Sequence, residues 1–318
     1  MPIAVCTMSH SPLMGVNPPA AAVAQAVHAA IDDARAFVAD YAPDVVVIFG
    51  PDHYNGVFYD LMPPFCVAAA ATSVGDHGTG GGPLRVDAAA AHIIASKVLD
   101  AGVDVALSER MLVDHGFTQV LEALFGSGTA VPVVPVFINA IAAPLGPLRR
   151  IRLLGRAVGT AAMGLGGRVL MVGSGGLSHD PPVPQLAGAP PAVAERLIAG
   201  RVPTAAERAG RERLTARLGR EFAQGSSAMR PLNPDWDRRV LDLLADGRLA
   251  EVDGWQNDWV VAEAGRAGHE VRTWIAAYAA LAAAGRYEIT SSFYQPIPEW
   301  IVGFGVTTAR SANSEEQS

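Results

Sequence analysis

The sequence contains little cysteine, lysine or net positive charge, and each shortage excludes a class of function. Cys6 and Cys66 are the only cysteines in 318 residues, so neither a disulfide framework nor a four-cysteine zinc cluster can form. Lys97 is the only lysine, and no GxxxxGK[ST] motif occurs, which argues against a Walker-type phosphate loop and against Schiff-base chemistry. The net charge of −7 argues against a general nucleic-acid partner, which requires an excess of cationic side chains.

Long apolar segments are also missing. The longest strongly apolar stretch, Trp274–Ala284, is shorter than the roughly 20 residues that cross a bilayer, and no basic region precedes an apolar run near Met1. Hydrophobic residues make up 50% of the chain and charged residues 17%, which is typical of a folded protein with a large core. We therefore expect a cytoplasmic protein with no membrane partner.

Short β-branched runs alternate with helical stretches in the first 180 residues. Each run is apolar at consecutive positions, as in strands that are buried on both faces of a sheet. The runs are Ile3–Thr7, Val45–Phe49, Val103–Leu107, Val131–Ile138 and Val169–Val172. The helical stretches are Ala20–Ala39, Ala88–Ala101, Thr118–Leu124 and Leu148–Met163. This alternation predicts an α/β fold, with a mostly parallel or mixed central sheet flanked by helices and an active site at the strand carboxyl ends.

The composition changes after residue 180. A proline-rich loop, Asp180–Pro191, precedes three helical stretches and an aromatic segment, Ser292–Gly305, that favours a late strand. The helical stretches are Ala205–Ala223, Trp236–Asp246 and Gly268–Ala284. We expect residues 1–308 to form a single catalytic domain, with a sub-boundary near residue 180 left open. Residues 309–318 are polar and predict a flexible tail.

Four of the eight histidines follow apolar runs. His10, His53 and His179 come just after predicted strands, and His115 follows the apolar triplet MLV. Ligands of open parallel sheets bind outside the carboxyl ends of the strands, so we expect these four imidazoles to converge on one site. Any one of them alone would more often be an ordinary surface residue. The glycine-rich stretch beside His77 predicts a mobile loop, to which we assign no role.

Histidines with nearby carboxylates and no cysteine cluster favour Zn, Fe or Mn. Two histidines and one carboxylate on one face of a metal leave open positions, as in non-haem Fe(II) sites that use O₂. The spacing does not identify the carboxylate. Asp52 and Asp114 could instead orient the histidines, and the simpler interpretation of Glu270 is that it complements the dipole of the helix it begins. No HExxH motif occurs, so a zincin-type protease is not indicated.

Eight blocks spread along the chain are similar to those of one enzyme superfamily. They are Cys6–Gly15, Phe49–Cys66, Val113–Phe117, Val134–Ala140, Gly173–Ala187, Pro231–Asp237, His269–Trp274 and Pro296–Gly305. Through these blocks the chain resembles, from end to end, the class III extradiol ring-cleavage dioxygenases, which include the catalytic subunit of protocatechuate 4,5-dioxygenase.

The resemblance implies a role for each matched residue. His10 and His53 match the family's two iron-binding histidines, and Glu270 matches the glutamate that completes the facial triad. His179 matches the base that accepts a proton from the catechol. His115 matches the acid that donates a proton during carbon–carbon cleavage.

The resemblance also implies Fe(II) as cofactor, a catechol and O₂ as substrates, and assembly into homo-oligomers. The expected reaction is extradiol cleavage of 3-(2,3-dihydroxyphenyl)propanoate, or a similar 3-substituted catechol, to a 2-hydroxy-6-oxo-dienedioate in aromatic catabolism. The residue that binds the side-chain carboxylate is not identified among the many arginines, and the nearness of Arg272 to Glu270 is a weak indication. One alternative is a metal-dependent hydrolase that uses zinc on the same histidines. Another is a non-enzymatic member of the fold that binds a partner in the cleft.

Overall fold

A computed structural model describes residues 3–126, 131–200 and 203–312. Among these residues, the central sheet has eight strands in the order β10-β11-β1-β9-β2-β8-β3-β6. In that order their bounds are Tyr287–Ile297, Val302–Ser311, Ile3–Met8, Val169–Ser174, Val45–Gly50, Val133–Ile138, Phe65–Ala68 and Ala106–Ser108. The inner strands β1, β9, β2 and β8 run parallel, whereas β11 is antiparallel to β1 and β3 is antiparallel to β8. The predicted α/β fold with a mixed sheet is confirmed.

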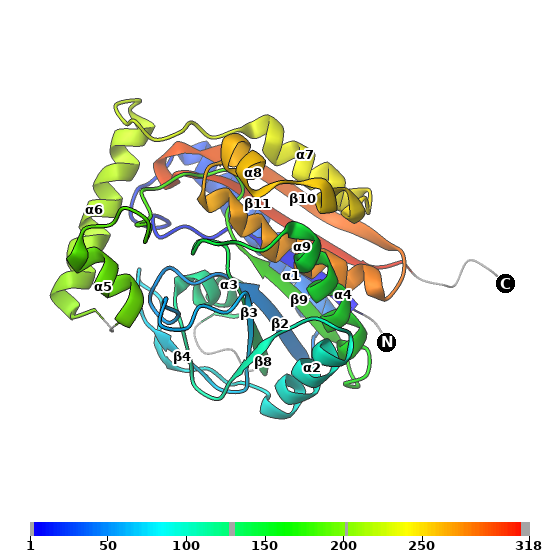
Figure 1. The fold of residues 1–318 in the computed structure, drawn as a ribbon. Helices are drawn as coiled ribbons and strands as arrows, with labels where there is room; N and C mark the ends of the chain where they lie inside the picture. The colour runs from blue at the N-terminus through cyan, green and yellow to red at the C-terminus, as the bar shows by residue number, and fades with distance from the viewer. Residues whose placement is uncertain (1–2, 127–130, 201–202, 313–318) are drawn as a thin grey trace.

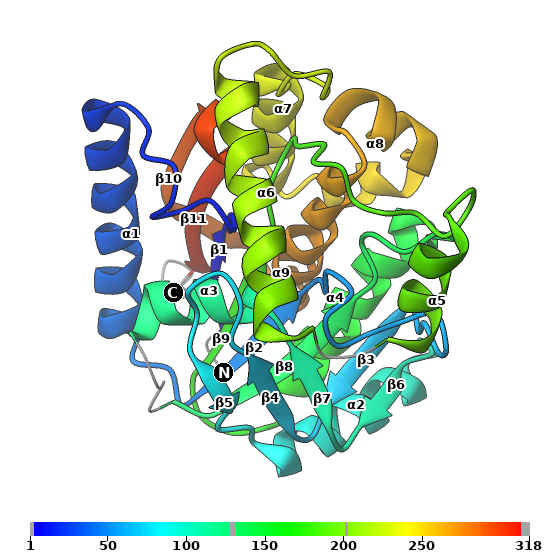
Figure 2. The ribbon, with the colours of Figure 1, turned by 90° about the vertical axis from the view of Figure 1, so that its left-hand side faces the viewer.

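Helices cover both faces of this sheet. Every residue of β1, β2, β8 and β9 is buried, as their uninterrupted apolar runs predict. Figure 2 shows α1 and α9 on opposite sides of the sheet, and each helix packs against its own apolar core. The α-helices α1 to α9 are Ala21–Tyr41, Ala88–Asp100, His115–Phe125, Leu148–Ala162, Pro191–Ala199, Ala205–Ala223, Pro234–Ala245, Asn257–Ala264 and Val271–Ala283. The short 3₁₀ helices η1, η2 and η3 are Leu249–Gly254, Ala267–Glu270 and Pro298–Trp300.

Helices α4 and α9 approach each other unusually closely on one face (Figure 1). Gly155 and Gly159 of α4 lie against the backbone of α9, where a Cβ atom at either position would overlap the carbonyl oxygen of Ala276 or Ala280. Glycine is therefore required at this crossing for steric reasons, since both positions have ordinary helical backbone. The contact sets the position of α9 over the sheet.

A smaller sheet pairs β4 (Ala71–Val74) with β5 (Gly81–Pro83) and with β7 (Met111–Val113). The predicted strand Val103–Leu107 is displaced, because only its last two residues fall within β6 of the central sheet. His115 therefore follows β7, outside the central sheet. Convergence of the four histidines was predicted on the condition that the preceding strands share one sheet, and His115 does not meet that condition because β7 belongs to the smaller sheet. Short apolar runs do not reveal which sheet a strand joins.

The C-terminal strands extend further than the sequence indicated. The segment Ser292–Gly305 is not one strand, because η3 separates β10 from β11 within it. Ala309 is fully buried and pairs with Val5 of β1, so the predicted flexible tail begins too early. Residues 313–318 of that tail lie outside the described residues.

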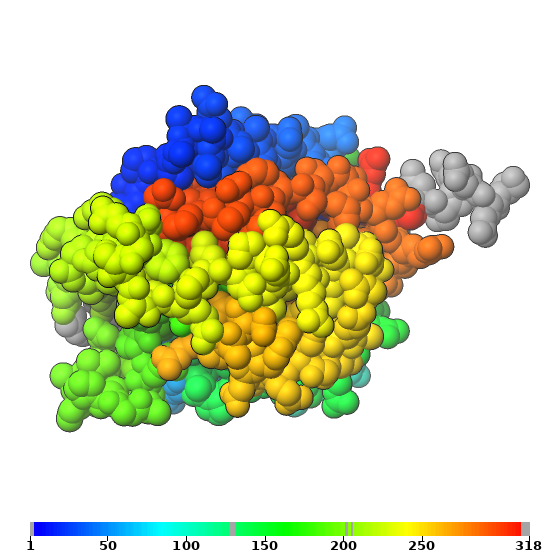
Figure 3. Space-filling model, turned by 90° about the horizontal axis from the view of Figure 1, so that it is seen from above, coloured from blue at the N-terminus to red at the C-terminus, as the bar shows by residue number. Residues whose placement is uncertain are grey.

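The segment from α6 to α8 spreads over one side of the molecule beside β10, as Figure 3 shows from above. Helix α6 begins with a capping box in which Thr204 and Glu207 exchange side-chain and backbone hydrogen bonds. Among the residues that the structure describes, no helix combines the length and the apolar character that crossing a membrane requires.

Candidate active site

Three of the four predicted site histidines follow adjacent strands of the central sheet. His10 comes after β1, His179 after β9 and His53 after β2, and these strands are neighbours that run in the same direction. Their carboxyl ends therefore lie at one edge of the sheet. The short helix η2, which precedes α9, brings Glu270 to the same edge.

The carboxylate of Glu270 lies among three imidazoles and is almost fully buried. Its Oε2 is 3.6 Å from His10 Nε2, and its Oε1 is 3.2 Å from His53 Nε2 and 3.4 Å from His179 Nε2. The backbone N–H of Gly176 donates to Oε2 at 2.7 Å. Glu270 makes no side-chain capping hydrogen bond to α9, so its side chain is committed to the histidines and not to the end of the helix.

His115 reaches the same place from the first turn of α3. Its ring centroid is 4.4 Å from that of His53 and 5.5 Å from that of His10, and a nitrogen from each of these three rings lies within 4.8 Å of the others. Asp76 holds His115 at two points, by accepting the backbone N–H at 2.8 Å and the Nδ1–H at 2.7 Å. The structure thus brings together all five residues that the sequence singled out.

The Nδ1 atom of each of the other three rings also has its own partner. His10 Nδ1 lies 3.0 Å from Ser174 Oγ, and His53 Nδ1 lies 3.0 Å from Asp114 Oδ2. Asp114 uses its other oxygen to cap α3 through the Gly116 N–H. A carboxylate or carbonyl partner can only accept, which places the proton of the neutral ring on Nδ1 and leaves Nε2 free to bind a metal or a proton.

His179 Nδ1 donates to the carbonyl oxygen of Leu177 at 2.8 Å. The loop that carries His179 is anchored by Asp237, which accepts the Ser178 N–H at 2.7 Å and the Ser178 hydroxyl at 2.8 Å. Tyr294 of β10 donates its hydroxyl to the same carboxylate at 2.7 Å. These contacts hold Nε2 of His179 toward Glu270.

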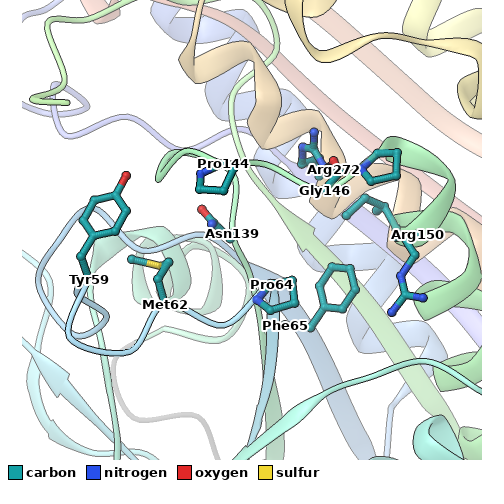
Figure 4. A pocket seen from close by; sticks show the side chains of 11 residues that line it. Tyr59, Met62, Pro64, Phe65, Asn139, Pro144, Gly146, Arg150 and Arg272 are labelled. Carbon is teal, nitrogen blue, oxygen red and sulfur yellow. Dashed lines mark hydrogen bonds between the residues drawn. The ribbon is translucent and has the colours of Figure 1, made fainter. Parts of the chain in front are cut away.

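A cavity of about 150 Å³ opens beside these residues. Its lining includes His53, Asp76, His77 and His115, together with residues of α6. A larger cavity of about 380 Å³ lies between the loop that carries Tyr59 and Met62 and the helices α4 and α9 (Figure 4). None of the four converging histidines lines that larger cavity.

Comparison with known proteins identifies the family. Residues 4–305 match the family described as the catalytic LigB subunit of aromatic ring-opening dioxygenase. The chain belongs to this family. The class III extradiol resemblance predicted from the sequence is confirmed, and the LigB-family fold agrees with the mixed sheet and flanking helices.

Three relatives of the LigB-family chain share the name "2,3-dihydroxyphenylpropionate/2,3-dihydroxicinnamic acid 1,2-dioxygenase". The protein from Rhodococcus sp is 65% identical and that from Rhodococcus jostii (strain RHA1) is 63% identical, each over 97% of this chain and 98% of its own length. The protein from Paraburkholderia xenovorans (strain LB400) is 54% identical over 98% of both chains. The chain is thus a ring-cleaving dioxygenase, and the hydrolase alternative is not favoured.

The crystal structure of the uncharacterized protein JW3007 from Escherichia coli K12 covers 97% of this chain, with a TM-score of 0.47 and 12% identity. This similarity is too low to support any argument about fold or function.

Burial and neighbouring charges together set the pKa values of the histidines and of Glu270 in the LigB-family site. Burial lowers the pKa of His10 to about 3, so this imidazole is neutral. Burial alone would also lower the pKa values of His53 and His179. The nearby carboxylates outweigh burial, so the pKa of His53 is raised by Asp114 and Glu270 and the pKa of His179 is raised by Glu270. Burial raises the pKa of Glu270, but the surrounding imidazoles hold it well below its usual range. A buried carboxylate anion faced by imidazoles attracts cations, either protons or a metal.

Sequence reasoning missed Asp76 and Asp237, the two carboxylates that hold His115 and His179. Asp76 was overlooked because it borders the glycine-rich stretch that predicted a mobile loop. In the structure its side chain is buried, and the backbone N–H of His77 donates to Glu212 of α6 at 3.1 Å. His77 adopts the left-handed conformation with φ of 47°, and its ring lies 4.7 Å from that of His115. Asp237 lies in the block PLNPDWD, so a signal for it was present.

Proposed function

We propose that this chain is an Fe(II)-dependent extradiol dioxygenase that cleaves 3-(2,3-dihydroxyphenyl)propanoate, or a similar 3-substituted catechol, with O₂. The product is a 2-hydroxy-6-oxo-dienedioate. The observation that carries the proposal is the Glu270 carboxylate, which lies 3.6 Å from His10 Nε2 and 3.2 Å from His53 Nε2. The substrate follows from relatives up to 65% identical that are named for 2,3-dihydroxyphenylpropionate.

The donor set and its spacing fit a ferrous ion. Two ligand atoms at about 2.1 Å from one ion and at right angles to each other are about 3 Å apart. The separations from Glu270 to His53, His179 and His10 are all near this value, so the choice of His10 and His53 as ligands rests on the family resemblance. Two imidazoles with one carboxylate form the facial set of non-haem Fe(II) oxygenases. When bound, Fe(II) supplies one centre at which the catechol and O₂ can meet.

The two remaining histidines differ in their surroundings, which suits them to opposite proton transfers. The Leu177 carbonyl accepts from Nδ1 of His179, so Nε2 of His179 is the atom that would accept a hydroxyl proton as the catechol binds. This requires the unprotonated ring, which a metal on Glu270 would favour by neutralising the carboxylate that raises the pKa of His179. Asp76 holds Nδ1 of His115, so Nε2 of His115 is the atom that delivers a proton during carbon–carbon cleavage. Two residues of one type can hold different protonation states because their environments differ.

The proposal treats residues 1–308 as one catalytic domain. Its support is that two proposed ligands follow β1 and β2 near the start of the chain, the third lies in η2 near its end, and all three meet at one sheet edge. Assembly into homo-oligomers stays a prediction of the family resemblance.

Turnover by iron-loaded protein tests the proposal. Protein loaded with Fe(II) without oxygen, then given 2,3-dihydroxyphenylpropionate and air, should form a yellow ring-fission product and consume one O₂ per product. The same protein loaded with Zn²⁺ should form none, because zinc has no redox chemistry. Absence of both colour and O₂ uptake with several 3-substituted catechols would show that the proposal is wrong.

A further inference from the structure

We propose that Arg208 and Arg211 of α6 form the subsite that binds the anionic side chain of the catechol. This inference rests on the proposed function and adds to it the residues that select a carboxylate-bearing substrate.

The first support is the position of α6 over the cavity beside the histidines. Arg208, Arg211, Glu212 and Thr215 all line this cavity, together with His53 and His115. Their spacing of three, four and seven residues places them on one face of the helix. Figure 2 shows α6 crossing in front of the central strands. A substrate that meets the histidines through its hydroxyl groups therefore faces two guanidinium-bearing residues across the same small space.

The second support is that Arg208 is held in place. Its Nη1 donates to the carbonyl oxygens of Val74 at 2.7 Å and Gly75 at 2.6 Å. The next residue, Asp76, holds the ring of His115. A guanidinium has five N–H donors in one plane, and both of these hydrogen bonds use a single nitrogen. Arg208 is thus fixed relative to the proposed acid before a ligand arrives, which reduces the entropy lost on binding.

The helix itself is tied to the sheet edge at its other end. Asn17 donates to the Ala216 carbonyl oxygen at 2.9 Å and accepts from Arg220 Nη1 at 3.2 Å. These contacts position α6 over the loop that follows β1 and carries His10. The arginines of α6 are therefore presented at a defined distance from the proposed metal ligands.

The two acidic residues of the cavity, Asp76 and Glu212, already have hydrogen-bond partners on the loop that carries His77 and on His115. Both oxygens of Asp76 accept hydrogen bonds from His115, and Oε1 of Glu212 accepts the backbone N–H of His77. An incoming carboxylate matches the planar fork of a guanidinium and can accept two parallel hydrogen bonds from it.

The arginine that lies nearest Glu270 in the sequence is not suited to this role. Arg272 lines the larger cavity (Figure 4), is 1% exposed and donates to the Gly146 carbonyl oxygen and to Asn257 Oδ1. His53 and His115 line the smaller cavity with α6, and none of the converging histidines lines the larger one, so the proposal places the side chain of the catechol toward α6.

The test compares 2,3-dihydroxyphenylpropionate with its methyl ester, which has an uncharged tail of similar shape. Removing a hydrogen bond to a charged group should lower kcat/KM for the acid about 10- to 100-fold in Arg208→Met and in Arg211→Met, mainly through KM. The ester should change by less than about twofold. Arg213→Met is the matched control, because Arg213 lies on the same helix but is exposed and does not line the cavity.

The ratio of kcat/KM for the acid to kcat/KM for the ester distinguishes a loss of carboxylate binding from a general structural defect. A variant that merely distorts the loop at Val74 and Gly75 loses activity on acid and ester alike. If both arginine variants keep the wild-type preference for the acid, or lose both substrates equally, the subsite is wrong. If the iron-loaded wild-type protein cleaves neither substrate, the proposed function has failed, and that failure is distinct because it precedes any mutation.

Discussion

At the scale of single residues, the candidate site is built from imidazoles whose Nδ1 atoms are already committed. Ser174, Asp114, Asp76 and Leu177 each hold one ring, and three of the four Nε2 atoms lie within 3.6 Å of Glu270. The histidines thus differ less in where they lie than in what holds them. The family resemblance, and not these contacts, is the basis for assigning His10 and His53 to metal binding and the other two to proton transfer.

The division can be tested by iron content. His10→Ala and His53→Ala should fail to retain Fe(II), because each removes a proposed ligand. His115→Ala and His179→Ala should retain it and lose about 10²- to 10⁴-fold in kcat, the usual contribution of a general acid or base. Iron per chain after anaerobic loading and desalting, measured beside kcat, distinguishes the two groups.

His28→Ala is the control for these variants, because His28 is exposed on α1 and should alter neither iron content nor kcat. A His179→Ala protein that binds no iron would contradict the assignment of ligands and proton-transfer residues.

At the scale of elements, the crossing of α4 and α9 matters for the site because Glu270 directly precedes α9. The glycines of α4 allow α9 to lie close to its neighbour, and Gly175, after β9, packs directly against Glu270. The position of the carboxylate is therefore a consequence of helix packing far from the histidines.

Adding one methyl group at this crossing should destabilise the protein. Gly155→Ala introduces a Cβ that overlaps the Ala276 carbonyl, and such overpacking typically lowers the free energy of unfolding by about 1–3 kcal/mol. Thermal unfolding should show a Tm lowered by several degrees. Gly210→Ala on α6 is the matched control, since a Cβ atom added there would meet nothing within 4 Å and helical alanine is favoured over glycine. Equal Tm values for the two variants would contradict the packing argument.

At the scale of the whole molecule, the proposed metal joins segments that are remote in the chain. His53 and Glu270 are separated by 217 positions, and His10 lies near the first strand. A metal that binds only the folded chain stabilises it, by about 2.7 kcal/mol at a concentration one hundred times its Kd. Occupancy of the metal site should therefore change the free energy of unfolding of the whole protein as well as its activity.

The stabilisation of the folded protein by Fe(II) should increase with pH. In the metal-free protein the raised pKa of His53 favours the protonated ring. Protonation therefore stabilises the metal-free fold. This contribution is fully present below the pKa of the unfolded state and is lost as pH rises through the pKa of the folded state. Fe(II) requires the unprotonated ring, so its affinity changes in the opposite direction. The difference in Tm between iron-loaded and metal-free protein, measured without oxygen, should be larger at about pH 8 than at about pH 6. A difference that is the same at both pH values would contradict metal binding at these imidazoles.

Much of the fold could be predicted from short segments of the sequence. Continuous apolar runs identified the buried strands β1, β2, β8 and β9, because a strand covered on both faces needs apolar side chains at every position. The short strands β4, β5 and β7 were not predicted, since three or four residues carry too little periodicity to identify a strand.

The sequence by itself determined which residues are candidates for the chemistry: histidines placed after apolar runs, and family blocks that include Glu270. Only the tertiary structure decided how they meet. From its residues alone, Glu270 favoured a helix-dipole role, and packing of α9 turned it toward the histidines. Asp76 and Arg208 had no local signal, because their significance comes from contacts with His115 and with the backbone at Gly75, far away in the chain. Local sequence sets the conformation of each segment, whereas the long-range packing of strands and helices sets which side chains share a site.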